Sequence, residues 1–192
     1  MQIDSQFQPA ELLLQNQKMP PCPDNILKNL GVMTVTYHGF DDTLHQGQII
    51  VATEVMPEVE TFFKHALEIG FNIERVAPVS APTYRWDSKK VLKDNLSSGF
   101  DFRYIKGTNK ISLHGQGRAF DINPQQNPYI IYKNGRPEVI PKGASWNPSK
   151  LGTLHAEHPL VKLMEGLGWE WGGHWTPDSG RTDYQHFQKY DE

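Results

Sequence analysis

The chain has 192 residues, of which 38% are hydrophobic and 21% are charged, and its formal net charge is −3. These values are typical of one globular domain, and with no basic run longer than Lys89-Lys90 they give little support to a nucleic-acid partner. Cys22 is the only cysteine, which excludes an internal disulfide and a thiolate-rich structural zinc site.

Residues 1–30 are expected to form an arm that precedes a single domain over residues 31–192. The arm is rich in glutamine and proline around one short apolar patch at 10–14, so at most a brief helix is predicted there. It has no basic region near its start, and its longest apolar run is Leu12-Leu13-Leu14. The sequence therefore predicts neither a signal peptide nor a membrane span.

Two strands are predicted at 32–37 and 48–52, where β-branched residues flank a connection that contains Gly, Asp and His. An amphipathic helix is predicted after them, because Pro57 and Gly70 stand where helices prefer to begin and end. Its apolar residues recur at helical spacing: Val59, Phe62, Phe63, Ala66 and Leu67. A stripe without a polar member indicates core packing, so this helix is assigned no chemistry.

The rest of the chain mixes short strands and helices. Asn134-Gly135 lies between the apolar segments 129–132 and 138–140 and is a strong signal for a β-hairpin. Helices are expected at 88–95 and 159–167, the second ended by Gly168, and short strands at 72–77, 169–171 and 184–188. The pattern predicts an α+β fold, a single domain with one small antiparallel sheet and flanking helices.

One imidazole and one carboxylate, His114 and Asp121, lie seven positions apart in Ser-Leu-His-Gly-Gln-Gly-Arg-Ala-Phe-Asp. On a continuous strand this odd separation would place the two side chains on opposite faces. Gly115 and Gly117 permit a tight turn between them, which would let the imidazole and the carboxylate converge.

A second carboxylate and imidazole, Asp183 and His186, lie three positions apart near the C-terminus. They would reach one site if Asp183 lies in the turn leading into the last strand. Two imidazoles and one carboxylate form a ligand set that suits zinc, and three protein ligands leave the fourth tetrahedral position to water. That is the arrangement of a catalytic zinc.

The ordinary alternative for each histidine is a hydrogen-bonded residue without chemistry, and His114 taken alone would indicate nothing more. The same interpretation is kept for the histidines whose surroundings do not repeat the pattern, namely His38, His45, His65, His155 and His158. His174 stands among Trp169, Trp171 and Trp175, where it could line the wall of a site.

Ser112, His114, Gly117, Ala119 and Asp121 match the motif Ser-x-His-x-x-Gly-x-Ala-x-Asp of the VanY-like D-alanyl-D-alanine carboxypeptidases and related L-alanyl-D-glutamate endopeptidases. The run Trp171-Gly172-Gly173 to Trp175, followed by Asp183 to Phe187, resembles their second signature, Trp-Gly-Gly-x-Trp and then Asp-x-x-His-Phe. The two motifs occur in the family's order, and the resemblance extends over about residues 35–188.

The resemblance implies one zinc ion per chain, held by His114, Asp121 and His186. It also implies that Asp183 is the general base that assists attack by the zinc-bound water. An arginine upstream of the first ligand contributes to substrate binding in the similar enzymes, which implies this role for Arg103. An aspartate as the base favours the carboxypeptidase and endopeptidase branches over the dipeptidase branch, which uses glutamate.

Substrate contacts are assigned to Ser112, Trp171 and Trp175. For the two tryptophans, burial with a purely packing role is an equally good alternative. The bond that is cleaved depends on the shape of the cleft, because a carboxypeptidase needs a cationic stop for a free C-terminus and an endopeptidase needs a cleft open at both ends. The sequence reveals neither shape.

The resemblance therefore predicts a zinc metallopeptidase that acts on peptidoglycan stem peptides, as a D-Ala-D-Ala carboxypeptidase or an L-Ala-D-Glu endopeptidase. The alternative is a non-catalytic zinc-containing binding domain of the same fold, and the presence of Asp183 favours the enzyme. The expected site of action is the periplasm or cell wall. With no signal peptide in the sequence, this requires either a leader missing from the chain or phage-type release. The oligomeric state does not follow from the sequence.

Overall fold

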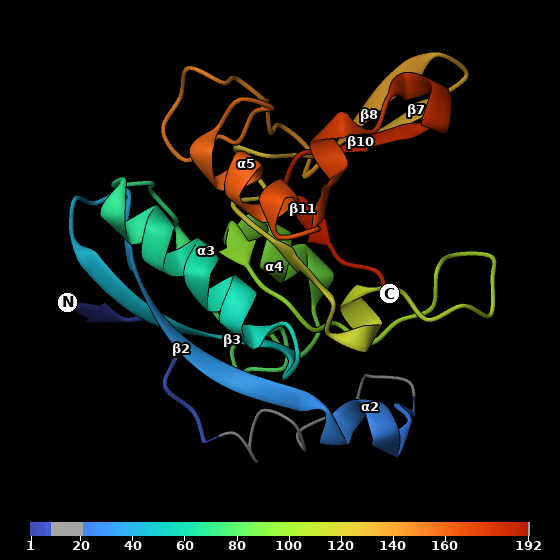
Figure 1. Cartoon of the computed structure of the whole chain (residues 1–192). Helices are drawn as coiled ribbons and strands as arrows, with labels where there is room; N and C mark the ends of the chain where they lie inside the picture. Colours follow the sequence, from blue (N-terminus) through green and yellow to red (C-terminus); the bar gives the residue numbers. More distant parts are fainter. Residues whose placement is uncertain (9–20, 192) are drawn as a thin grey trace.

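The computed structural model describes residues 1–8 and 21–191 and mixes helices with several small sheets (Figure 1). The longest strands, β2 (Leu30–His38) and β3 (Leu44–Ala52), form an antiparallel ribbon whose register runs from Leu30 opposite Ala52 to His38 opposite Leu44. The predicted strand pair is therefore confirmed and is longer than expected. The short strand β1 (Gln2–Ile3) adds to β3 in parallel.

Helix α3 (Met56–Glu68) packs on β2, and its predicted apolar stripe provides much of the main core. Val59, Phe62, Phe63 and Ala66 are buried. Helix α5 (Pro159–Gly166) lies beside α3, as Figure 1 shows, and contributes Leu160, Val161 and Met164 to the same core. The expected helices after Pro57 and before Gly168 are both confirmed.

The central sheet consists of β6 (Ala119–Asp121), β11 (His186–Gln188) and β9 (Glu170–Trp171), in the order β6-β11-β9 and with both pairs antiparallel. One face of this sheet packs onto the core. Phe62 of α3 contacts the rings of Phe120 and Phe187, with centroid distances of 5.1 and 5.6 Å. This packing fixes the strands that carry the candidate ligands relative to α3.

A second antiparallel sheet, in the order β10-β7-β8, extends away from the core. The predicted hairpin is confirmed as β7 (Tyr129–Lys133) and β8 (Arg136–Ile140), with Asn134 and Gly135 at φ of 51° and 73° in the connecting turn. The third strand, β10 (Arg181–Asp183), pairs with β7 and was not predicted.

The remaining elements are short. Helices α2 (Asp24–Lys28) and α4 (Ser88–Lys93) and strand β5 (Leu96–Ser97) contribute to a smaller second core. Strand β4 (Arg75–Val76) pairs with β5 in parallel and places Val76 in the main core. The strand expected at 72–77 shortens to β4. Three 3₁₀ turns complete the described part of the chain: η1 (His114–Gln116), η2 (Gly172–His174) and η3 (Pro177–Ser179).

The mixed helix-and-sheet class is confirmed, but the expectation of one small antiparallel sheet needs correction. The described residues form four separate sheets, two of which contain a parallel pair. Strands of two or three residues give too little periodicity to show which of them pair. The apolar patch at 10–14 lies outside the described residues, and the division at residue 30 stays a prediction. No helix in the described part of the chain is long and apolar enough to cross a membrane.

Candidate metal centre

His114 and Asp121 are brought together by the tight turn that the glycines were predicted to supply. His114 begins the 3₁₀ turn η1, and Gly117 ends it with φ of 74°, a conformation that favours glycine. A Cβ atom at Gly117 would also stand 2.6 Å from the Ala52 nitrogen. The chain then enters β6, which ends at Asp121.

His186 reaches the same point through strand pairing. In the antiparallel register of β6 and β11, His186 stands directly opposite Asp121. Side chains of directly opposed residues lie on the same face of a sheet and close to one another. The sheet thus places a carboxylate beside one imidazole, and the turn at η1 brings in the other.

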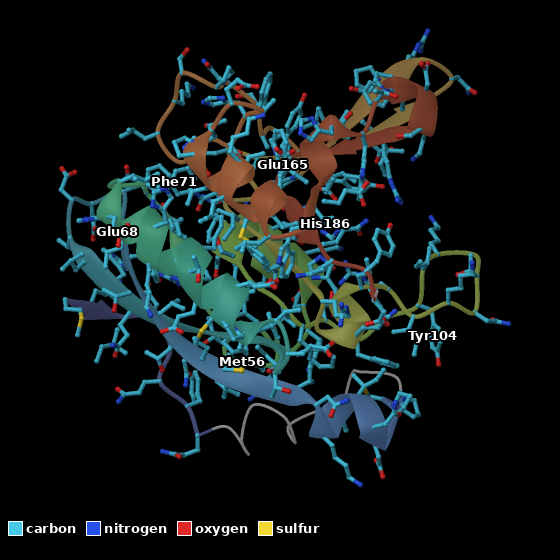
Figure 2. All side chains as sticks on the ribbon, viewed as in Figure 1. Met56, Glu68, Phe71, Tyr104, Glu165 and His186 are labelled. Atoms are coloured by element: carbon cyan, nitrogen blue, oxygen red, sulfur yellow. The ribbon has the colours of Figure 1, made fainter. Side chains whose placement is uncertain are left out.

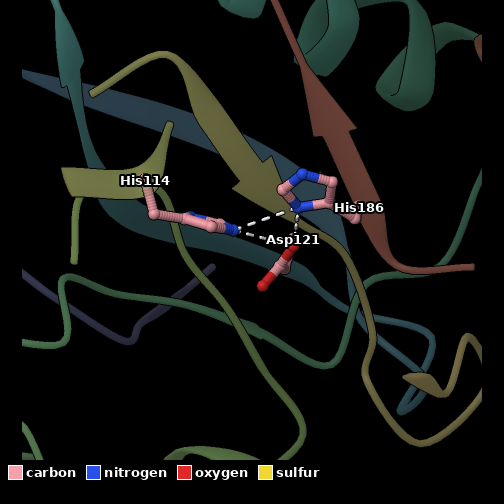
Figure 3. Close-up of side chains that lie close together, drawn as sticks. All are labelled: His114, Asp121 and His186. Atoms are coloured by element: carbon pink, nitrogen blue, oxygen red, sulfur yellow. Dashed lines mark hydrogen bonds and ion pairs between the residues drawn. The ribbon is translucent and has the colours of Figure 1, made fainter. Parts of the chain in front are cut away.

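The three side chains converge on one point, as Figure 3 shows. Nε2 of His114 lies 3.1 Å from Nδ1 of His186 and 3.2 Å from Oδ1 of Asp121. The third side of this triangle, between Nδ1 of His186 and Oδ1 of Asp121, is 3.0 Å. Both histidines are buried, so these groups are largely shielded from bulk water.

The outward nitrogen of each imidazole is hydrogen-bonded, which orients both rings. Nδ1 of His114 donates to the Gly99 carbonyl oxygen (2.7 Å), and Nε2 of His186 donates to Oε1 of Gln188 (2.9 Å). The Gln188 amide is itself fixed, because its nitrogen donates to Oε2 of Glu170 (2.6 Å) and to the Tyr190 hydroxyl (2.8 Å). Such outer hydrogen bonds set the tautomer and direction of metal-binding histidines.

This donor set fits a divalent cation. With both outward nitrogens protonated, the inward nitrogens of His114 and His186 present lone pairs to each other and to the Asp121 carboxylate. Only an added proton or a bound cation removes the repulsion between these facing lone pairs. Ligands about 2.0–2.2 Å from a tetrahedral zinc stand about 3.3–3.6 Å apart, so a small outward shift of these side chains would accommodate the ion.

The electrostatics of the cluster also favour a bound positive charge. Burial would raise the pKa of the Asp121 carboxyl, but the adjacent His114 and His186 hold it well below its usual range. Burial would lower the pKa of His186, yet its hydrogen bond to Asp121 and the nearby carboxylate charges raise it. The site attracts positive charge, whether a proton or a metal ion.

Asp183 stands at the end of β10, one two-residue turn before His186. Its Oδ1 atom is buried and has no hydrogen-bond partner among the described residues. Burial raises the pKa of the Asp183 carboxyl to about 7, helped by the Asp121 charge and opposed by His186 and Arg181. A carboxyl group that titrates near neutrality can both accept and return a proton.

The cluster opens into a cleft of about 1130 Å³, lined by Asp121, Asp183 and both histidines. One wall is the loop between Arg103 and Ser112, whose two arms are joined by an isolated β-bridge between Tyr104 and Ile111. Figure 2 labels Tyr104 in this loop, to one side of His186. The other wall is the β10-β7 surface, with Tyr129, Ile131 and Arg181. The candidate ligands therefore lie at the floor of a substantial groove.

The predicted substrate contacts lie in different places. Arg103 and Ser112 line the cleft, but Arg103 is ion-paired with Asp101, and the Ser112 hydroxyl accepts from the Gly115 amide (3.0 Å). Trp175 also lines the cleft, whereas Trp171 is buried and does not reach it. The indole of Trp171 donates to the Tyr184 carbonyl oxygen (2.9 Å), as expected of a packing residue.

His174, considered as a wall residue, does not line the cleft in the structure. It pairs with Glu165 (2.5 Å) and packs against the ring of Trp171. In this segment, therefore, Trp171 and His174 have packing roles, and Trp175 lines the cleft.

Four residues of the site were not identified from the sequence: Glu170, Arg181, Gln185 and Gln188. Gln188 and Arg181 each stand two residues from a predicted site residue, so strand alternation could have marked both. Glu170 and Gln185 had no such signal. Gln185 is buried at the cleft with its Oε1 atom unpaired among the described residues.

Comparison with known proteins supports the resemblance found in the motifs. Residues 106–189 match the family model described as D-alanyl-D-alanine carboxypeptidase. This segment includes the three convergent side chains, Asp183 and both motifs. No curated protein and no solved structure shows significant similarity to the chain. The resemblance to the VanY-like peptidases is therefore confirmed over this part of the chain.

Proposed function

We propose that the protein is a zinc-dependent peptidase that hydrolyses amide bonds in peptidoglycan stem peptides. The family match supports a peptidase. The observation that carries the rest is the convergence of three inward donors, on His114, Asp121 and His186, beside the Asp183 carboxyl at the floor of one cleft. The Oδ1 atom of that carboxyl is buried and has no hydrogen-bond partner among the described residues. A non-catalytic binding domain would have no need for that carboxyl.

Zinc held by the three ligands would supply Lewis-acid chemistry, activating a water molecule and polarising the substrate carbonyl. Asp183 would accept the proton of the attacking water at its carboxylate and return it to the nitrogen of the leaving amine. A cation at the three ligands favours the charged form of Asp183, which counteracts the effect of burial on its pKa.

The cleft residues would bind and orient the peptide. Arg103 keeps free N–H groups beyond its ion pair with Asp101, since a guanidinium carries five donors, and these can stabilise negative charge that develops on the carbonyl oxygen. Trp175 and Ser112 also line the cleft. Because this substrate lies outside the cytoplasm, we propose the periplasm or cell wall as the site of action.

Replacement of Asp183 tests the catalytic role. Asp183→Ala and Asp183→Asn should lower the release of new amines from purified peptidoglycan by about 10²–10⁴-fold, the usual contribution of a general base. Zinc content, measured on the same samples, should stay at one ion per chain. Asp178→Asn is the matched control, because Asp178 is an exposed aspartate of η3 that does not line the cleft. Unchanged amine release by the Asp183 variants would refute the proposal.

A further inference from the structure

The β10 strand presents a second charged group to the cleft besides Asp183. Arg181 and Asp183 both line the cleft, while Thr182 between them is buried on the opposite face and its hydroxyl donates to the Trp175 carbonyl oxygen (2.7 Å). Residues two apart in a strand are separated by about 7 Å. A cationic group therefore stands on the same side of the strand as the candidate base, about 7 Å along it.

Arg181 is held in place without being neutralised. Its guanidinium carbon lies 4.5 Å from the centre of the Trp175 ring, and the Trp175 indole is fixed by its hydrogen bond to Oε1 of Glu170 (2.7 Å). Across residues 1–8 and 21–191, Arg181 makes no ion pair. Stacking on an aromatic ring orients the guanidinium plane and leaves its N–H fork available for a carboxylate.

The other charges of the cleft divide into paired and unpaired groups. Arg103 is neutralised by Asp101, and Asp191 by Arg118. Lys106 and Lys110 line the cleft opposite β10 and, among the described residues, have no acidic partner. With Asp121 assigned to the metal, the cleft carries a surplus of unpaired cations and suits an anionic ligand.

We propose that Arg181 is a specificity-determining residue that binds the free carboxylate of the residue on the leaving side of the scissile amide. This rests on the proposed peptidase function and sharpens its substrate class. The two candidate bonds share this chemistry. In D-Ala-D-Ala the leaving residue ends in a carboxylate, and in L-Ala-D-Glu the glutamate, when linked onward through its side chain, keeps its α-carboxylate free. The proposal predicts that amidation of this carboxylate lowers kcat/KM for the substrate.

Paired peptides that differ only in this group test the proposal. Diacetyl-L-Lys-D-Ala-D-Ala is compared with its C-terminal amide, and acetyl-L-Ala-γ-D-Glu-L-Lys with the form amidated at the α-carboxylate. The pair that is cleaved identifies the bond. For that pair, the zinc-loaded protein should prefer the free acid by about 10- to 100-fold in kcat/KM, the range of a charge-assisted hydrogen bond. Equal cleavage of acid and amide would overturn the proposal.

Variants of Arg181 test whether this residue causes the preference for the free acid over the amide. Arg181→Gln should cleave acid and amide at nearly equal rates, and Arg181→Lys should keep part of the preference because it retains the charge without the fork. Arg136→Gln is the matched control, since Arg136 is an exposed arginine of the same sheet that does not line the cleft. It removes the same charge and should keep the full preference. Loss of selectivity in both Gln variants would show a general charge effect and refute the role of Arg181.

A binding measurement separates this inference from the proposed function. In the Asp183→Asn background, calorimetric titration with each acid and amide should show tighter binding of the acid, and Arg181→Gln should abolish the difference. If no peptide is hydrolysed by the intact protein, the proposed function fails, yet this difference in Kd would still establish the carboxylate site. Equal affinities, or no binding of either form, would overturn the inference whether or not hydrolysis occurs.

Discussion

Among the described residues, a buried histidine meets aspartate in two clusters, and the two differ in what the imidazole nitrogens face. In the first, His45 lies between Asp4 and Asp41, with its Nδ1 atom 2.9 Å from Asp4 and its Nε2 atom 3.0 Å from Asp41. In the second, His114 and His186 share one carboxylate, Asp121. Composition alone would not distinguish the two.

The difference lies in what the ring nitrogens of each cluster face. Both nitrogens of His45 face carboxylates, its ring stacks on Tyr37 (centroids 5.6 Å apart), and the Tyr37 hydroxyl donates to Asp4. A protonated imidazole satisfies that cluster completely, and it fastens the segment around Asp4 to β3. In the His114 and His186 cluster each imidazole uses one nitrogen outward, and the inward nitrogens face each other and Asp121, where an added proton or a cation would bind. The first cluster is a structural clamp, and the second is a candidate metal site.

Zinc should therefore stabilise the protein through the second cluster alone. At a free concentration of about 1,000 times Kd, a ligand that binds only the folded state adds about 4 kcal/mol to the free energy of unfolding. His114→Ala should remove nearly all of this increment, because only two of the three protein ligands would remain. His45→Gln should lower the starting stability and keep the increment. Urea unfolding with zinc and with a chelator measures both. An unchanged increment in the His114 variant would contradict the comparison.

The hydrogen bonds behind the ligands should have a smaller effect. Gln188→Ala removes the acceptor that orients His186 and should weaken zinc binding by about 10- to 100-fold, the usual effect of losing such a partner. Competition with a chromophoric chelator gives the Kd. Gln125→Ala is the control, because Gln125 is exposed and its side-chain amide donates to the Leu92 and Lys93 carbonyl oxygens near α4, away from the candidate site. A Kd for Gln188→Ala equal to that of the unchanged protein would show that His186 needs no such support.

The sequence predicted the parts of the fold with strong local signals. The stripe of α3, the Asn134-Gly135 turn and the glycines after His114 each act through residues a few positions apart. Strand β10 has only three residues and exists because it pairs with β7, about fifty positions earlier. Which strands pair depends on packing across the whole domain, so the sheet arrangement could not be obtained from local patterns.

In the candidate site, too, some residues had a local sequence signal and others did not. The convergent donors were identified because two motifs contain them, whereas two of the residues behind them, Gly99 and Glu170, are distant in the sequence. Gly99 lies fifteen residues before His114, and Glu170 reaches His186 only through Gln188. The His45 cluster was equally hidden, since Asp4 lies forty-one residues from its partner. The candidate metal ligands left a sequence pattern here, and the distant residues that support them through hydrogen bonds did not.

The smallest expected effect concerns the charge of His45. Burial would lower the pKa of His45, but its hydrogen bonds to Asp41 and Asp4 and the charges of both carboxylates raise it above its usual value. A group whose pKa is raised on folding contributes stability that is fully present below its unfolded pKa of about 6.5 and is lost as the pH rises through the folded pKa. His45→Gln should therefore cost more stability at pH 5.5 than in alkaline solution.

The expected difference is about 1 kcal/mol, the gap between charged and neutral hydrogen bonds. Urea unfolding of both proteins from pH 5 to 10 measures it. His65→Gln is the control, because His65 is paired with the exposed Glu68, at 3.3 Å, and its loss should change stability little. A His45→Gln cost that is independent of pH would mean that the imidazole is neutral in the fold. The clamp would then be an uncharged hydrogen-bonded cluster, and the contrast with the metal site would rest on geometry alone.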